Sequence, residues 1–99
     1  MFEKLEQLVL EWANNKGIMD NSTPLDQFGK TSEEVDELYE ALMTNDALET
    51  KDAIGDIVVT LIIQAKMQNL TINECLQHAY KIISKRKGKM VDGVFVKDV

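Results

Sequence analysis

The sequence has few of the residues that build disulfide frameworks and soft-metal sites. Its 99 residues include one cysteine, Cys75, and one histidine, His78. A single cysteine excludes an intramolecular disulfide and fits a reducing cytoplasm, and the two residues together are too few for a zinc or copper site. We expect Cys75 to be a small core residue and His78 to be a solvated surface residue.

Long apolar runs are also missing from the chain. No stretch of about 18 uncharged apolar residues exists, so the sequence predicts no membrane-spanning helix. The acidic, amphipathic start MFEKLEQL argues against a secretory signal. With 44% apolar and 28% charged residues, the composition is that of a globular protein. We therefore expect one domain over residues 1–99, in the cytoplasm, or in the host cytoplasm if the chain is viral.

The net charge of −6 is unevenly distributed. Residues 81–99 hold six basic and two acidic side chains, a net charge of +4, so residues 1–80 carry −10. An acidic body with a basic tail lacks the broad positive face that general nucleic-acid binding requires. The distribution suits a complex of a metal ion with a polyphosphate, and a solvated lysine-rich end explains it equally well.

Hydrophobic periodicity of about 3.6 residues predicts four helices. They cover residues 1–14, 24–45, 46–69 and 71–86. The second helix has the clearest start: Thr23 can serve as N-cap, Pro24 fits the first helical position, and Asp26 completes a capping box. Thr71 and Glu74 are expected to form another capping box at the start of the last helix. Residues 18–23 are expected to be a linker.

Short connections between these helices predict an all-α fold, an antiparallel four-helix bundle. Gly88 is expected to end the last helix, and residues 90–96 are expected to form a short C-terminal β-hairpin around the Asp92-Gly93 turn.

Two apolar surfaces are expected to be buried. One is a stripe on helix 24–45, made of Phe28, Val35, Leu38, Tyr39 and Leu42. The other is the middle of helix 46–69, which is apolar nearly all round its axis. In a chain this short, the spare apolar surface of residues 53–65 is expected to meet a second subunit, so that the chain oligomerises through its helices as a homodimer or homotetramer.

Paired carboxylates border both apolar surfaces. Glu34 and Glu37 lie one turn apart beside the stripe of helix 24–45, and Asp52 and Asp56 share one face at the start of the next helix. If the two helices pack face to face, four carboxylates converge with Lys30 as the nearby counter-charge. Ionised carboxylates in such a place need compensation, and Mg²⁺ is the hard cation that prefers oxygen ligands.

Each acidic pair taken alone is also typical of a solvated helix surface, and Asp52 can simply favour a helix N-terminus. The combination of paired acids on two adjacent helices, both beside apolar faces, favours the metal-site interpretation.

This pattern resembles the MazG-like, all-α nucleoside triphosphate pyrophosphohydrolases, relatives of the dimeric dUTPases. The family motif is EExxE, a spacer and then ExxD, and the chain has EEVDE at 33–37 and DAIGD at 52–56. Ala53 stands where the family has the first acid of the second motif, so Asp52 is taken as the replacement ligand. The ending AYKIISKRKGKMVDGVFVK is similar to that of small phage and prophage-type members.

The resemblance implies Mg²⁺-dependent cleavage, with Mn²⁺ as an alternative cofactor, of an NTP or dNTP to the nucleoside monophosphate and pyrophosphate. The implied metal ligands are Glu34, Glu37, Asp52 and Asp56. The implied catalytic residues are Glu33, Glu34 and Glu37, with either Glu33 or Glu37 orienting or deprotonating the attacking water. The implied substrate contacts are Gln27, Lys30, Arg86 and Lys89. A core role is favoured for Trp12 over stacking on a base.

Two other classes of protein are compatible with the same residues. One is a non-enzymatic regulatory module that dimerises through residues 53–65, which Mg²⁺ and nucleotide would not stabilise. The other is a cation-binding structural bundle, which a metal would stabilise without any hydrolysis.

Overall fold

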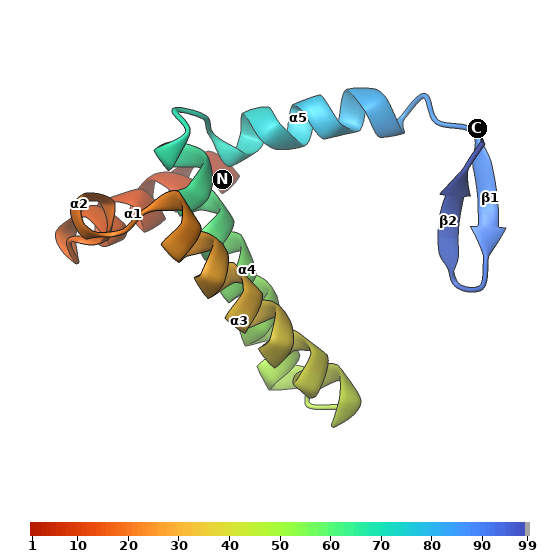
Figure 1. The fold of residues 1–99 in the computed structure, drawn as a ribbon, viewed down its shortest axis with the longest axis horizontal. Helices are drawn as coiled ribbons and strands as arrows, with labels where there is room; N and C mark the ends of the chain where they lie inside the picture. Colours follow the sequence, from red (N-terminus) through yellow and green to blue (C-terminus); the bar gives the residue numbers. More distant parts are fainter. Residues whose placement is uncertain (99) are drawn as a thin grey trace.

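The computed structural model describes residues 1–98, which are mostly helical and end in a short β-hairpin, as predicted (Figure 1). The elements are α1 (Phe2–Asn15), α2 (Ile18–Asn21), α3 (Pro24–Met43), α4 (Ala47–Met67), α5 (Ile72–Ile83), β1 (Gly88–Val91) and β2 (Val94–Lys97). No helix within these residues is both long enough and apolar enough to cross a lipid bilayer.

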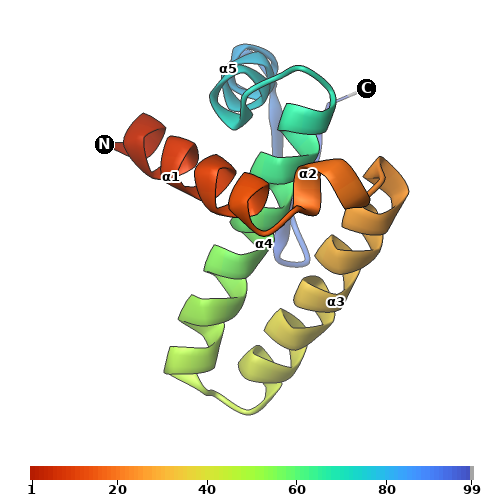
Figure 2. The same cartoon turned by 90° about the vertical axis from the view of Figure 1, so that its left-hand side faces the viewer.

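The centre of the fold is the antiparallel pair of α3 and α4, which α1 crosses (Figure 2). Two side-chain hydrogen bonds join α3 to α4. The Thr31 hydroxyl donates a hydrogen bond to Thr60 Oγ1 at 2.8 Å, and Gln64 Nε2 donates one to the carbonyl of Pro24 at 2.8 Å. These bonds lie toward the start of α3 and the end of α4, so they hold the two helices in one register.

The helix starts follow the predicted capping residues. The Thr23 hydroxyl accepts from the Asp26 N–H, the Asp26 carboxylate accepts from the Thr23 N–H, and Thr71 and Glu74 form the same reciprocal box. Glu6 adds a contact that the sequence did not predict: it is buried, and its Oε2 accepts from the Ile72 N–H at 2.8 Å. This bond joins the start of α5 to α1.

The expectation of a linker over residues 18–23 is wrong in part, because Ile18–Asn21 forms the single helical turn α2. Gly17, with φ of 78°, reverses the chain after α1 in the left-handed region that glycine adopts readily. The Asn21 side-chain amide then donates to the carbonyl of Gly17 at 2.8 Å and closes the turn.

The β-hairpin has the predicted turn, with positive φ at both Asp92 and Gly93. The expected role of Gly88 is wrong: α5 ends at Ile83, and Gly88 opens β1, opposite Lys97. A Cβ atom at Gly88 would collide with the carbonyl oxygen of Val96, so only glycine allows the two strands to approach at this point.

The predicted four-helix bundle is not closed within one chain. Helix α5 leads away from the other helices and carries the hairpin at its far end (Figure 1), and none of its residues is buried. The expected core stripe of α3 is also largely exposed: Phe28 is 65% exposed and Tyr39 is 64% exposed. The residues of α3 that are buried are Gln27, Glu34 and Ala41, because α4 packs against the neighbouring face of the helix.

The hydrophobic core of one chain is small. Its buried apolar residues are Ala13, Ala41, Ala53, Ile62, Ile63 and Ala65. The accessible surface is 7877 Å², whereas a compact protein of 11.2 kDa exposes about 5,700 Å². The radius of gyration is 15.8 Å, against about 13 Å for a compact chain of this length. One copy therefore leaves much apolar surface uncovered.

We predict that Thr23→Ala lowers the free energy of unfolding by about 1 kcal/mol, because it removes the oxygen that accepts from the first turn of α3. Thr23→Ser keeps that oxygen and is expected to stay close to the wild type. Urea denaturation at one protein concentration compares the three proteins, and equal losses in both variants would contradict the capping role.

The same capping box predicts a dependence on pH. The backbone N–H of Thr23, and then its hydroxyl, hold the pKa of Asp26 below its ordinary value. A carboxylate with a lower pKa in the folded state contributes stability above its unfolded pKa and loses it as the pH falls through the folded pKa. The stability difference between wild type and Asp26→Asn is therefore expected to be largest at neutral pH and to shrink on acidification. Urea denaturation of both proteins from neutral to acidic pH measures this stability difference. A difference that does not change with pH would refute the prediction.

Candidate metal centre

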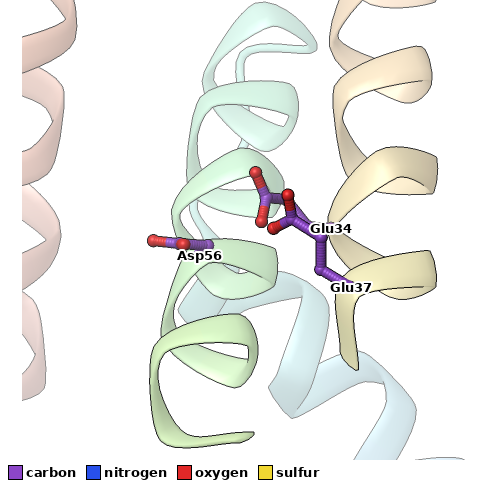
Figure 3. Close-up of side chains that lie close together, drawn as sticks. All are labelled: Glu34, Glu37 and Asp56. Carbon is purple, nitrogen blue, oxygen red and sulfur yellow. The ribbon is translucent and has the colours of Figure 1, made fainter. Parts of the chain in front are cut away.

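Helices α3 and α4 bring three carboxylates together. Glu34 and Glu37 reach from successive turns of α3 toward α4, which carries Asp56 (Figure 3). One carboxylate oxygen from each of the three residues lies within 4.8 Å of the others. We refer to these three residues as the acidic cluster.

Glu34 is the residue of the acidic cluster that the fold buries. Its side chain is 7% exposed, and its Oε2 atom is buried without a hydrogen-bond partner. The other oxygen, Oε1, lies 3.4 Å from Lys30 Nζ. A buried, ionised oxygen without a donor is costly. Glu34 therefore presents an oxygen that a positive ligand can satisfy.

The carboxylates of the acidic cluster repel one another. Close side-chain contact with Glu34, and then the charge of Glu34, raise the pKa of Glu37 above its ordinary value. Asp56 raises the same pKa further, whereas Lys30 lowers it. Lys30 is itself shared between Glu33, at 3.7 Å, and Glu34. One lysine thus faces more negative charge than it neutralises.

The chemistry of the donors suits a hard divalent cation. All three residues offer oxygen, which Mg²⁺ and Mn²⁺ prefer, and three side chains leave room in the coordination shell for water or phosphate oxygens. Because Glu37 and Asp56 are exposed, neighbouring side chains do not hold their carboxylates in one orientation.

Asp52 is not part of the acidic cluster. It is exposed, one turn before Asp56 on α4. Glu33 is likewise exposed, and its contact is the ion pair with Lys30. Gln27 is buried, and its Nε2 donates to Ser22 Oγ at 3.1 Å, which holds the start of α3 against α2. The roles predicted for these side chains remain predictions.

The predicted phosphate contacts divide into two groups. Lys30 lies beside the acidic cluster. Arg86, between α5 and β1, and Lys89, in β1, are exposed in the part of the chain that leads away from α3 and α4 (Figure 1). Within one chain, these two basic residues do not join Lys30.

The expectation that Trp12 belongs to the core is wrong. Trp12 is 48% exposed and lines a cleft of about 660 Å³. Gln27, Lys30 and Thr60 also line this cleft, so it adjoins the acidic cluster on the side of Lys30. Sequence reasoning missed the position because Trp12 continues the apolar periodicity of α1, and periodicity alone does not separate a core residue from the wall of a cleft.

The two residues that were expected to carry no chemistry differ in burial. His78 is exposed, as expected. Cys75 was expected in the core, but it is only half-buried, because α5 contacts the other helices only near its start.

Comparison with known proteins points to one family. Residues 23–91 match the family described as MazG nucleotide pyrophosphohydrolase domain. The chain is also similar to an uncharacterized 18.2 kDa protein of the rep-hol intergenic region of Haemophilus phage HP1, at 36% identity over 69 residues. That match covers 67% of this chain and 42% of the phage protein, so the chain spans less than half of that relative. No solved structure matches the chain with significance.

We predict that Mg²⁺ or Mn²⁺ raises the unfolding temperature of the wild type, since a ligand of the folded state adds about 2.7 kcal/mol at 100 times its Kd. Glu34→Gln is expected to abolish this shift without lowering the unfolding temperature of the metal-free protein, because the amide carries no buried charge. Asp36→Asn, on the same helix but outside the acidic cluster, is the matched control and is expected to keep the shift. Differential scanning calorimetry with and without metal decides between these outcomes. An unchanged shift in Glu34→Gln would place the metal elsewhere.

Proposed function

The chain belongs to the MazG nucleotide pyrophosphohydrolase family, and from this membership we propose that it hydrolyses nucleoside triphosphates to the monophosphate and pyrophosphate, with Mg²⁺ as its cofactor. The observation that carries the proposal is the burial of the Glu34 carboxylate. Its buried oxygen has no partner, and it lies in a group of three carboxylates that a single lysine does not neutralise. Such a group is stable when a divalent cation is present, and a triphosphate is a substrate that brings further oxygen ligands to that cation.

In this proposal Glu34, Glu37 and Asp56 hold the metal, and Asp52, one turn away on α4, is an additional ligand. A divalent cation at this site supplies neutralisation of the triphosphate charge and activation of water. The residues beside the metal site are proposed to transfer the proton and to bind the phosphates.

Glu33 is proposed as the base, because it lines the cleft beside Lys30 and lies outside the acidic cluster. Water attacks the α-phosphorus, its proton passes to the Glu33 carboxylate, and the bond to the bridging oxygen breaks so that pyrophosphate leaves. Lys30, whose Nζ lies between Glu33 and Glu34, is positioned to contact the negative charge of the phosphates.

The nucleoside is proposed to occupy the cleft beside Lys30. The cleft has a volume of about 660 Å³, a size typical of small-molecule sites. Trp12 offers an aromatic face, Val59 and Ile63 offer apolar contacts, and the amide of Gln27 offers hydrogen bonds. This mixture of one aromatic ring, apolar walls and few polar groups suits a nucleobase.

We also propose that the active form is a homodimer or homotetramer. A second copy would cover the exposed apolar face of α3 and complete the helical bundle that one chain leaves open.

We predict that the wild type with Mg²⁺ releases pyrophosphate, and not orthophosphate, from at least one member of a panel of NTPs and dNTPs. Glu37→Gln and Asp56→Asn are each expected to lower turnover by about 100-fold or more, because each removes a ligand of the metal that stabilises the transition state. Asp36→Asn is expected to keep full activity. Anion-exchange separation of the products measures turnover, and circular dichroism confirms an unchanged helix content. Release of orthophosphate alone, or full activity in Asp56→Asn, would falsify the proposal.

A further inference from the structure

Gly29 lies inside α3 at a position where the structure of the chain does not require a glycine. Its φ is not positive, unlike that of Gly17 and Gly93. Apart from the adjoining backbone of its own helix, a Cβ atom on Gly29 would meet no atom within 4 Å. Glycine weakens the interior of a helix relative to alanine. Within the described residues of one chain, Gly29 therefore lowers the stability of α3 and relieves no close contact.

Gly29 also lines the cleft of about 660 Å³ beside Lys30. The wall that α3 gives to this cleft has five members. Leu25, Gly29 and Glu33 follow one another at four-residue spacing on one face of the helix, and Asp26 and Lys30 stand beside them. Each of these positions except Gly29 carries a side chain. The wall therefore has a gap between Leu25 and Glu33.

Two polar side chains of the same cleft are held in place by hydrogen bonds. Gln27 is buried, and its Nε2 donates to Ser22 Oγ at 3.1 Å. Thr60 is also buried, and its hydroxyl oxygen accepts from the Thr31 hydroxyl at 2.8 Å. Because these bonds fix both side chains, the gap at Gly29 is the part of the cleft that offers additional room.

The gap lies beside the groups that are proposed to face the phosphates. Lys30 is the next residue, and its Nζ lies 3.7 Å from the Glu33 carboxylate and 3.4 Å from that of Glu34. Glu33 follows Gly29 by about 6 Å along the helix axis. In a nucleoside triphosphate one sugar joins the base to the α-phosphate. A base beside Gly29 therefore leaves the α-phosphate near Lys30 and Glu33.

We propose that Gly29 is a specificity-determining residue, whose missing side chain leaves room against α3 for the two fused rings of a purine. This inference rests on the proposed function for the class of ligand. A pyrimidine has one ring and would leave the gap empty, whereas a purine fills it with its second ring. A side chain at position 29 would occupy the same space, so it acts against purine nucleotides more than against pyrimidine nucleotides.

Substitution by alanine separates this role from a structural one. Gly29→Ala is expected to raise the midpoint of urea denaturation, because alanine favours the helix and meets no neighbour at this position. A lower midpoint would show that the glycine serves the packing of the protein, and it would overturn the proposal.

Trp12 reports binding in the cleft without any turnover, because it lines the cleft and is the one tryptophan of the chain. Its fluorescence is titrated with AMP, GMP, CMP and UMP and with their 2′-deoxy forms. Wild type is expected to bind at least one purine monophosphate more tightly than either pyrimidine monophosphate. Gly29→Leu is expected to weaken that purine by about tenfold or more and the pyrimidines by less.

Ser32→Leu is the matched control, because it adds the same side chain to α3 at an exposed position that does not line the cleft. It is expected to bind every nucleotide as the wild type does. Tighter binding of pyrimidines by the wild type, an unchanged purine affinity in Gly29→Leu, or an equal loss in Ser32→Leu would each overturn the proposal.

Steady-state kinetics with the triphosphates connects the gap to the reaction. Gly29→Leu is expected to raise the KM for the preferred purine nucleotide about tenfold or more and to keep kcat within about twofold, because the acidic cluster is untouched. A lower kcat at an unchanged KM would overturn the proposal. If the wild type releases no pyrophosphate from any nucleotide, the proposed function fails, and the fluorescence titrations still decide whether Gly29 admits a purine.

Discussion

The burial of Glu34 is the constraint on which the site depends. The side chain lies where α3 meets α4, and one of its oxygens has no partner there. An apolar side chain at this position would pack against α4 at no electrostatic cost, so the fold retains a charge that it does not neutralise by itself. The packing of two helices and the binding of a cation are therefore linked through one residue. Lys30 compensates the negative charge on one oxygen of Glu34. The carboxylates of Glu37 and Asp56 add negative charge and so increase the need for a cation.

A second constraint is the size of the chain. Within one copy, α1, α3 and α4 enclose mostly alanine and isoleucine, and the large apolar residues of α3 and α5 stay exposed. A bundle of this length closes only when further helices are supplied. Because the core is small, the bundle stays open. The apolar groove of about 360 Å³ between α1 and α4, beside Asp56, is accessible for the same reason. The open bundle therefore determines both the stability of a single copy and the access to the site.

Much of the local structure could be predicted because it depends on neighbours in sequence. The capping boxes at Thr23 and Thr71 and the Asp92-Gly93 turn all involve residues within a few positions of one another. The sequence predicted that Glu34, Glu37, Asp52 and Asp56 converge if the two helices pack face to face. The structure brings Glu34, Glu37 and Asp56 together and leaves Asp52 outside this group. The single turn α2 was missed because it depends on a side-chain contact from Asn21 back to Gly17.

By itself, the sequence determined the four longer helices, their starts, the hairpin turn and the pairing of acidic residues, since each of these follows from backbone preferences and helical spacing. The tertiary structure alone decided which face of α3 is buried, which carboxylate loses its solvent, and that Trp12 lines a cleft. It also decided that α5 leaves the bundle. These features depend on where distant segments meet. Residue periodicity gives the width of an apolar face, but it does not say whether the same chain or another copy covers it.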